Sequence, residues 1–259
     1  WGGGLYSQGV TTTLTSVVFV NNLAGQAGGG MWSVDRSASL TDVAFSENYG
    51  GLCGGGLAGA RLSGDVVRET NDVRLTDVTL TNNEARDGGG LCVGQASFRV
   101  YGEDGSSQPD AHEASVTTYE HGWHLTRVTL AGNRASGGSD GDGGGMHVYN
   151  RHAVLRDVVF HGNHASDEGG GLYSEQSYPT LLNVTFSGNR AESSGGAMYN
   201  DDGSPALVNC ILWGNAAPTG PEMVNPPRSR PLVMYSDVDV GHSGVYTGEE
   251  NINADPLFV

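Results

Sequence analysis

The sequence predicts an all-β fold: a right-handed parallel β-helix, or solenoid, of about seven 26-residue coils followed by a C-terminal closing segment. A glycine triplet recurs along the chain, with copies that begin at Gly2, Gly28, Gly54, Gly88, Gly143, Gly169 and Gly195. Four of the six intervals are 26 residues long. Between the triplets, apolar residues alternate as they do in strands and do not follow the 3.6-residue period of helices. Short strands that recur in this way bury their inner faces by winding into a coil, so each strand pairs in parallel with its equivalent one turn on.

Each repeat presents the same elements in the same order. A short strand follows the triplet, as in "GGGLYS" at 169–174, and a second segment reads L-x-x-V-x-F/L-x-x-N, as in 181–189. We expect its Leu, Val and Phe to stack inside the coil. The closing Asn recurs as Asn22, Asn48, Asn83, Asn133, Asn163, Asn189 and Asn215. Asn tolerates the left-handed conformation and can bond to the amide of the next coil, so these residues predict a ladder at a turn. The triplet fits a corner without room for side chains.

The charge of the chain excludes some partners. It has 29 acidic residues and 13 basic ones, all of them Arg, which gives a net charge of -16. Such a chain repels nucleic acid and anionic membranes, which are both polyanions. It also lacks an apolar run of 18 residues. We therefore expect no nucleic-acid partner and no direct membrane insertion.

The three cysteines do not form a closed disulfide framework, because their number is odd. Cys210 takes the inward position that Val17 has in the first repeat and is expected to be a buried apolar residue. Cys53 and Cys92 are five residues out of phase on neighbouring coils, which argues against a direct bond. Trp1 begins within a repeat. We expect one β-helix domain, residues 1–259, that is part of a longer precursor.

These motifs resemble a known family. "GGGL" and "GGAM", together with "FSEN", "FHGN" and "FSGN", are similar to the GGA(I/L/V) and FxxN repeats of chlamydial polymorphic outer membrane proteins and of bacterial secreted right-handed β-helix proteins. The resemblance covers about residues 2–217, and the tail to Val259 is similar to the closing segment of large bacterial surface proteins with this repeat. It implies a β-helix at the cell surface, in a family that includes adhesins and autotransporter passengers.

Two insertions interrupt the repeat, at about residues 57–75 and 91–125, and we expect them to form one lobe because they fall at the same turn of consecutive coils. The larger insertion holds candidate binding residues, namely His112, Glu113, His121, Trp123 and His124. His-x-x-His beside His-Glu is a set that can ligate a transition metal. The alternative is that these side chains are only solvated.

A second candidate binding group follows the ladder Asn on three consecutive coils, where Arg134, His164 and Arg190 form a basic stripe. Such a stripe can hold the carboxylates of an acidic glycan. The alternative is that it balances the charge of Glu84 and Glu192.

The position after the Leu of the first strand is largely aromatic and reads Tyr6, Trp32, Ala58, Cys92, His147, Tyr173 and Tyr199. Such a column can stack on sugar rings, or it can stabilise the outside of the β-helix without any ligand.

No cofactor is expected, apart from calcium at Asp140 and Asp142. These two residues alternate with Gly in "GGSDGDGGG", a pattern that can present oxygen atoms to calcium and is equally typical of a surface loop.

The sequence favours a non-enzymatic extracellular or cell-surface domain, a stalk or passenger for adhesion. Its expected partners are a surface glycan or protein, or further copies stacked end to end. The alternative is a polysaccharide lyase or glycoside hydrolase that acts on an acidic glycan. A lyase needs a base and cations beside a uronate, and without Lys only the Arg and His residues supply them. A hydrolase needs two carboxylates, and the abundant acidic residues do not single out a pair.

Overall fold

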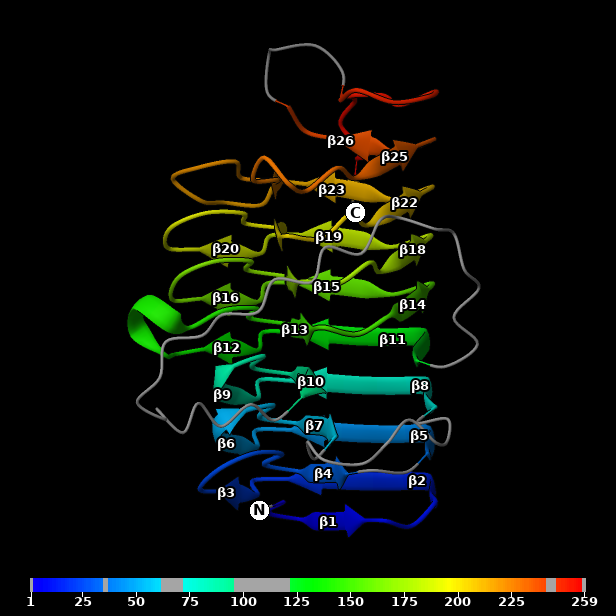
Figure 1. Ribbon diagram of the computed structural model, residues 1–259, viewed down its shortest axis with the longest axis vertical. Coiled ribbons are helices and arrows are strands. Elements are labelled where there is room, and N and C mark those ends of the chain that lie inside the picture. The colour runs from blue at the N-terminus through cyan, green and yellow to red at the C-terminus, as the bar shows by residue number, and fades with distance from the viewer. Residues whose placement is uncertain (1, 35–36, 62–71, 96–121, 241–245, 258–259) are drawn as a thin grey trace.

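The strands stack into a parallel β-helix, which confirms the predicted fold (Figure 1). The computed structural model describes residues 2–34, 37–61, 72–95, 122–240 and 246–257. Most of the two predicted insertions lies outside these residues, as do His112, Glu113 and His121.

Sheet A contains the strand that follows each glycine triplet. Its eight strands are all parallel and in order are β1 (Leu5–Gln8), β4 (Met31–Val34), β7 (Leu57–Arg61), β10 (Leu91–Gln95), β13 (Met146–Tyr149), β17 (Leu172–Glu175), β21 (Met198–Asp201) and β24 (Met223–Val224). Leu91 pairs with Met146 across the larger insertion. The repeat therefore keeps its register on both sides of that interruption.

Sheet B contains the L-x-x-V-x-F/L segment and turns a corner within it. Its long strands are β2 (Thr12–Val20), β5 (Ala38–Ser46), β8 (Val73–Thr81) and β11 (Trp123–Ala131). In the later coils the segment divides into β14 (Ala153–Arg156) and β15 (Val159–His161), β18 (Thr180–Leu182) and β19 (Thr185–Ser187), β22 (Ala206–Val208) and β23 (Ile211–Trp213), and β25 (Leu232–Met234) and β26 (Asp237–Val238). The corner residue, for example Asp157 (φ 55°) or Asn183 (φ 56°), is left-handed in each coil. This corner gives the β-helix two of its sides.

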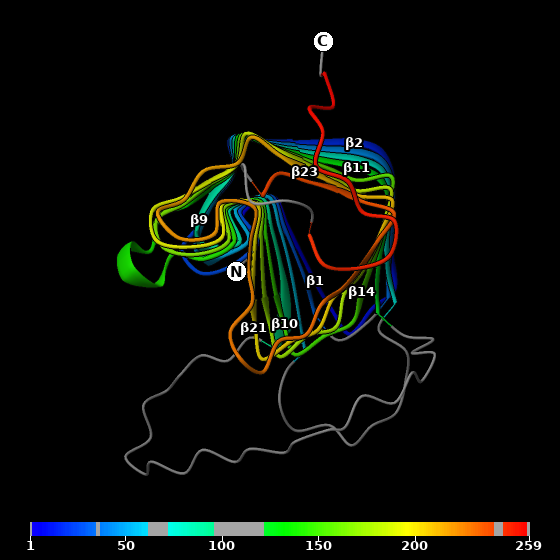
Figure 2. The same ribbon diagram turned by 90° about the horizontal axis from the view of Figure 1, so that it is seen from above.

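Sheet C forms a narrow lobe at one edge of the β-helix, seen beside β9 in Figure 2. Its strands are β3 (Leu23–Ala24), β6 (Tyr49–Cys53), β9 (Glu84–Asp87), β12 (Arg134–Ala135), β16 (His164–Ala165) and β20 (Arg190–Ala191). A short 3-10 helix, η1 (Gly138–Asp140), lies next to β12 in sequence. After sheet C, the glycine triplet returns the chain to sheet A.

The core consists of stacked columns of inward side chains, as predicted. Phe45 lies on Phe19 with ring centroids 4.8 Å apart, and Phe186 lies on Phe160 at 4.5 Å. Cys210 is 1% exposed, in line with its expected apolar role. Each such burial stabilises the fold by roughly 1.5 to 3 kcal/mol.

The glycine triplet turns the corner for two separate reasons. Gly169 has φ +65°, which side chains disfavour, and a Cβ on Gly170 would overlap the carbonyl oxygen of Gly196 in the next coil. The third position is also tight, because a Cβ on Gly171 would lie 2.6 Å from the carbonyl oxygen of Ala197, although the seventh repeat has Ala197 at this position.

The seven Asn residues form the predicted ladder between coils. From Asn48 onward, each Oδ1 accepts from the backbone N–H and the side-chain amide of the Asn in the coil before it, at 2.9 to 3.0 Å. Glu222 ends this series, since its carboxylate accepts from the N–H and side-chain amide of Asn215 at 3.1 and 2.5 Å. The expectation that the ladder Asn is itself left-handed is wrong: that conformation belongs to the residue before it, such as Asn82 or Gly188.

Candidate functional site

The predicted basic stripe exists, because strand register places Arg134 beside His164 and His164 beside Arg190 on sheet C. Glu192 neutralises part of it. His164 Nε2 lies 2.8 Å from Glu192 Oε1, and Arg190 donates to both carboxylate oxygens at 3.1 and 3.0 Å. The Arg190 guanidinium, with a smaller contribution from His164, lowers the pKa of Glu192 to about 2. These contacts favour charge balance as the role of His164 and Arg190. Arg134 is exposed and has no ion pair with the described part of the chain.

Two residues of the predicted His-rich group, Trp123 and His124, lie in the described part of the chain, and their side chains point to opposite faces of β11. Trp123 is 5% exposed and part of the core, where a Cβ on Gly59 would overlap its indole. His124, the next residue of β11, lies on the opposite side of the strand and is half-buried. Burial, followed by the charge of Arg74, lowers the pKa of His124. Trp123 therefore supports the fold, and its side chain does not join His124 in a site.

The predicted aromatic column is partly covered. Trp32 is 1% exposed and Tyr173 is 7% exposed, although both occupy the outward position of sheet A. The ring centroids of Tyr173 and Tyr199 are 5.5 Å apart, and Tyr173 meets His147 edge-on at 4.9 Å. These contacts favour the structural role of this column.

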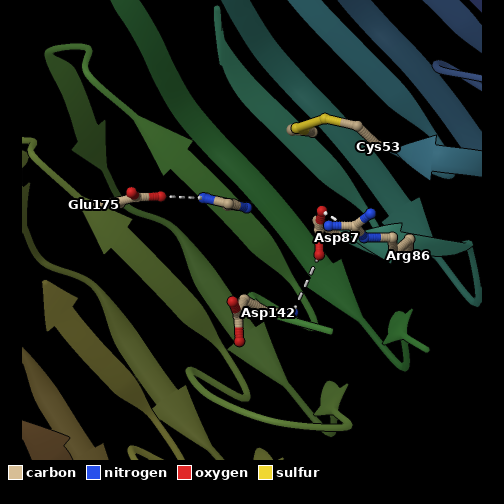
Figure 3. Close-up of a disulfide and its surroundings, with 7 residues drawn as sticks. Cys53, Arg86, Asp87, Asp142 and Glu175 are labelled. Carbon is tan, nitrogen blue, oxygen red and sulfur yellow. Dashed lines mark hydrogen bonds and ion pairs between the residues drawn. A yellow bond between two sulfur atoms is a disulfide. The ribbon is translucent and has the colours of Figure 1, made fainter. Parts of the chain in front are cut away.

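A column of carboxylates, which the sequence analysis did not single out, lies beside these aromatic residues. Asp87, Asp142 and Glu168 each precede a glycine triplet, in three consecutive coils. Asp87 Oδ1 accepts from the Asp142 N–H at 3.5 Å, and Asp142 Oδ1 accepts from the Glu168 N–H at 3.0 Å. Figure 3 shows Asp87 and Asp142 in neighbouring coils, with Arg86 next to Asp87. The sequence held one signal for this column, namely that an acidic residue comes directly before the glycine triplet in three consecutive coils.

Burial of like charges perturbs the acidity of this column. Burial raises the pKa of Asp142 to about 7, and burial together with the charges of Asp142 and Asp167 raises the pKa of Glu168 to about 7. Burial also raises the pKa of Asp87. The Tyr199 hydroxyl donates to the Glu168 carboxylate. The hydrogen bonds join neighbouring coils, while the buried charges oppose folding at neutral pH.

We expect Asp142→Asn to stabilise the protein at pH 8 by about 1–3 kcal/mol and to change its stability little at pH 4. A carboxyl whose pKa is raised by folding binds more protons in the folded state, so its contribution to stability falls as pH rises from about 4 to 7. Asn keeps the oxygen that accepts from Glu168 and removes the charge. Thermal unfolding of both proteins between pH 4 and pH 8 measures the difference. Parallel pH profiles would contradict this explanation.

A disulfide joins Cys53 to Cys92, with their Cα atoms 5.7 Å apart. The expectation that these residues do not bond is therefore wrong. Cys53 stacks between Ala27 and Asp87 in the position before the triplet, and the triplet corner returns the chain so that the position after Leu91 lies close to it. The contact between Glu168 and Tyr199 joins the same two positions in later coils. Figure 3 shows the disulfide beside the carboxylate column.

The calcium prediction concerns two residues that have different surroundings. Asp140 is exposed in η1, whereas Asp142 belongs to the carboxylate column. Among the described ranges, no group of three or more His, Cys, Asp or Glu residues has a metal-binding arrangement. The same ranges contain no helix with the length and apolar character to cross a membrane.

Comparison with known proteins identifies the repeat. Residues 157–175 and 183–201 match the Chlamydia polymorphic membrane protein (Chlamydia_PMP) repeat. Both matches begin at the left-handed corner of sheet B, include a ladder Asn and a glycine triplet, and end on the paired residues Glu175 and Asp201 of sheet A. No curated protein sequence matches the chain. The chain carries repeats of the Chlamydia polymorphic membrane protein type, which confirms the resemblance based on its GGGL and FxxN motifs.

Proposed function

We propose that this chain is a rigid β-helical segment of a bacterial cell-surface protein, which acts as a stalk or passenger in adhesion. The observation that carries the proposal is the pair of repeats typical of polymorphic membrane proteins. The disulfide between Cys53 and Cys92 supports it, because disulfides form and persist mainly in oxidising compartments outside the cytosol. The net charge of -16 suits an exposed, soluble exterior.

A stalk must transmit position without bending. Three sheets with in-register parallel pairing, and an Asn ladder that joins every coil to the next, supply that rigidity. The partner is a glycan or protein at the cell surface, or another copy of the same β-helix.

Antibodies raised against the purified chain test the location on cells that produce the protein. We expect staining of intact cells at a level close to that of permeabilised cells, with a cytosolic protein as the control that stains only after permeabilisation. Staining confined to permeabilised cells would overturn the proposal.

Adhesion is tested separately with Fab fragments of these antibodies. We expect them to reduce several-fold the attachment of the cells to the surface to which they adhere, and we expect Fab fragments against an unrelated surface protein to have no effect. If the Fab fragments stain the cell surface but do not reduce attachment, the chain is displayed on the surface and does not act in adhesion.

A further inference from the structure

A shallow depression of about 580 Å³ lies on the outer face of sheet B in the last coils. Strands β15, β19 and β23 form its floor, and register places Ser187 between His161 and Trp213. Val159 and Thr185 line the adjacent column. Trp213 is partly exposed and His161 is exposed, so both rings are accessible from solvent.

The depression is open because glycine occupies the left-handed turn beside it. Gly188 has φ +61° and Gly214 has φ +67°. In the third coil the equivalent turn residue is Asn82, which has a side chain. That side chain fills the space beside Gly132 of the next coil, so closely that a Cβ on Gly132 would overlap it. A Cβ on Gly214 would meet no atom within 4 Å, and one on Gly188 would meet only the ring of His161, at 3.7 Å. The missing side chains leave the space beside Trp213 uncovered.

The floor of the depression is uncharged, which is unusual on a chain with 29 acidic residues, and Asp237 of β26 follows Ile211 at its edge. The outward residues of β15, β19 and β23, which form this floor, are Val159, His161, Thr185, Ser187, Ile211 and Trp213. None of them is Asp, Glu or Arg. Ser187 Oγ lies 3.1 Å from His161 Nδ1, so hydroxyl and imidazole groups adjoin the indole.

We propose that this depression binds an uncharged oligosaccharide. A pyranose ring has an apolar face that stacks on an aromatic ring such as Trp213, and its hydroxyls bond to groups such as Ser187, Thr185 and His161. The outward residues of β15, β19 and β23 include no Arg, and the net charge of the chain is -16, so an acidic glycan is disfavoured as the ligand. This site gives the proposed surface protein a class of ligand. It rests on the proposed function in one respect, namely that the protein meets the oligosaccharide outside the cell.

Calorimetric titration of the purified chain tests the site with defined probes: cellohexaose, chitohexaose and maltohexaose as neutral glycans, and an oligogalacturonate as the acidic one. We expect at least one neutral probe to bind and the acidic probe not to bind. Trp213→Ala should weaken that binding about tenfold, since it removes the stacking surface.

A second variant fills the depression while Trp213 stays in place. Gly188→Asn should also weaken binding about tenfold, and it should fold normally because Asn21 and Asn82 adopt the same left-handed turn. Gly9→Asn is the matched control, because Gly9 is also left-handed and has open space around its Cβ. Val18→Ala is the control on the same outer face. Both should bind like the wild type.

Failure of all neutral probes at millimolar concentration, or unchanged binding by both Trp213→Ala and Gly188→Asn, would overturn the site. Binding by the acidic probe alone would also overturn it. The assay uses purified protein, so its failure is distinct from a failure of surface staining.

Discussion

Replacing Asn163 with Ala is expected to lower the free energy of unfolding by about 3–5 kcal/mol. The Asn163 side chain is fully buried. Its Oδ1 accepts from the N–H and side-chain amide of Asn133, and its Nδ2 donates to Leu130 O and Asn189 Oδ1, all at 2.8 to 3.0 Å. Ala removes these four hydrogen bonds and leaves the buried Asn133 N–H without its acceptor, which costs about 1–3 kcal/mol. Asn189 Oδ1 still accepts from the Asn163 N–H, and Asn133 Nδ2 still donates to Leu80 O, so the other lost bonds add smaller amounts.

Urea unfolding followed by circular dichroism measures this loss. Asn22→Ala is the informative comparison, because Asn22 is half-buried and is bonded to only one other ladder residue, Asn48. Its substitution should cost less than half as much. Thr79→Ala, on the exposed face of sheet B, should change stability by no more than about 0.5 kcal/mol. Equal losses at Asn22 and Asn163 would show that the ladder does not stabilise the coils through these bonds.

Reduction of the disulfide is expected to lower the free energy of unfolding by about 3–4 kcal/mol. Cys53 and Cys92 are 39 residues apart in sequence, so their bond closes a long loop in the unfolded chain. The same loss is expected for the Cys53→Ser, Cys92→Ser double variant. Urea unfolding with and without a phosphine reductant measures it.

The double variant is also the control, because its stability should not respond to the reductant. Cys210 should not contribute to the response, since its thiol is buried and burial raises its pKa to about 11. Thiol titration of the denatured protein should find one free thiol per chain before reduction and three afterwards. Three free thiols without reductant would contradict the disulfide.

The repeat made most of the fold predictable. A fixed 26-residue interval means that equivalent residues stack, so Phe160 on Phe186 and Asn163 on Asn189 followed from spacing alone. The basic stripe was also correctly aligned, because Arg134, His164 and Arg190 share one position in the repeat. The position in the repeat did not predict which carboxylate pairs with the stripe. Glu192 lies two residues after Arg190, and its side chain contacts both His164 and Arg190.

The disulfide escaped prediction for a related reason. Counting along the repeat places Cys53 and Cys92 five residues out of phase, and spacing alone does not reveal that the triplet corner brings these two positions together. The carboxylate column was visible as a recurrent acidic residue, but the raised pKa values of its members depend mainly on how deeply each carboxyl is buried, which the repeat does not specify.

By itself, the sequence determined the coil period, the inward columns and the Asn ladder, because each is a relation between residues at equal positions in successive repeats. Only the tertiary structure decided the disulfide, the raised pKa values near the triplet corner and the open depression beside Trp213. The disulfide and the burial of the carboxylates depend on contacts between different positions of neighbouring coils, which the triplet corner brings together. The depression depends on how the turns at Gly188 and Gly214 leave Trp213 uncovered.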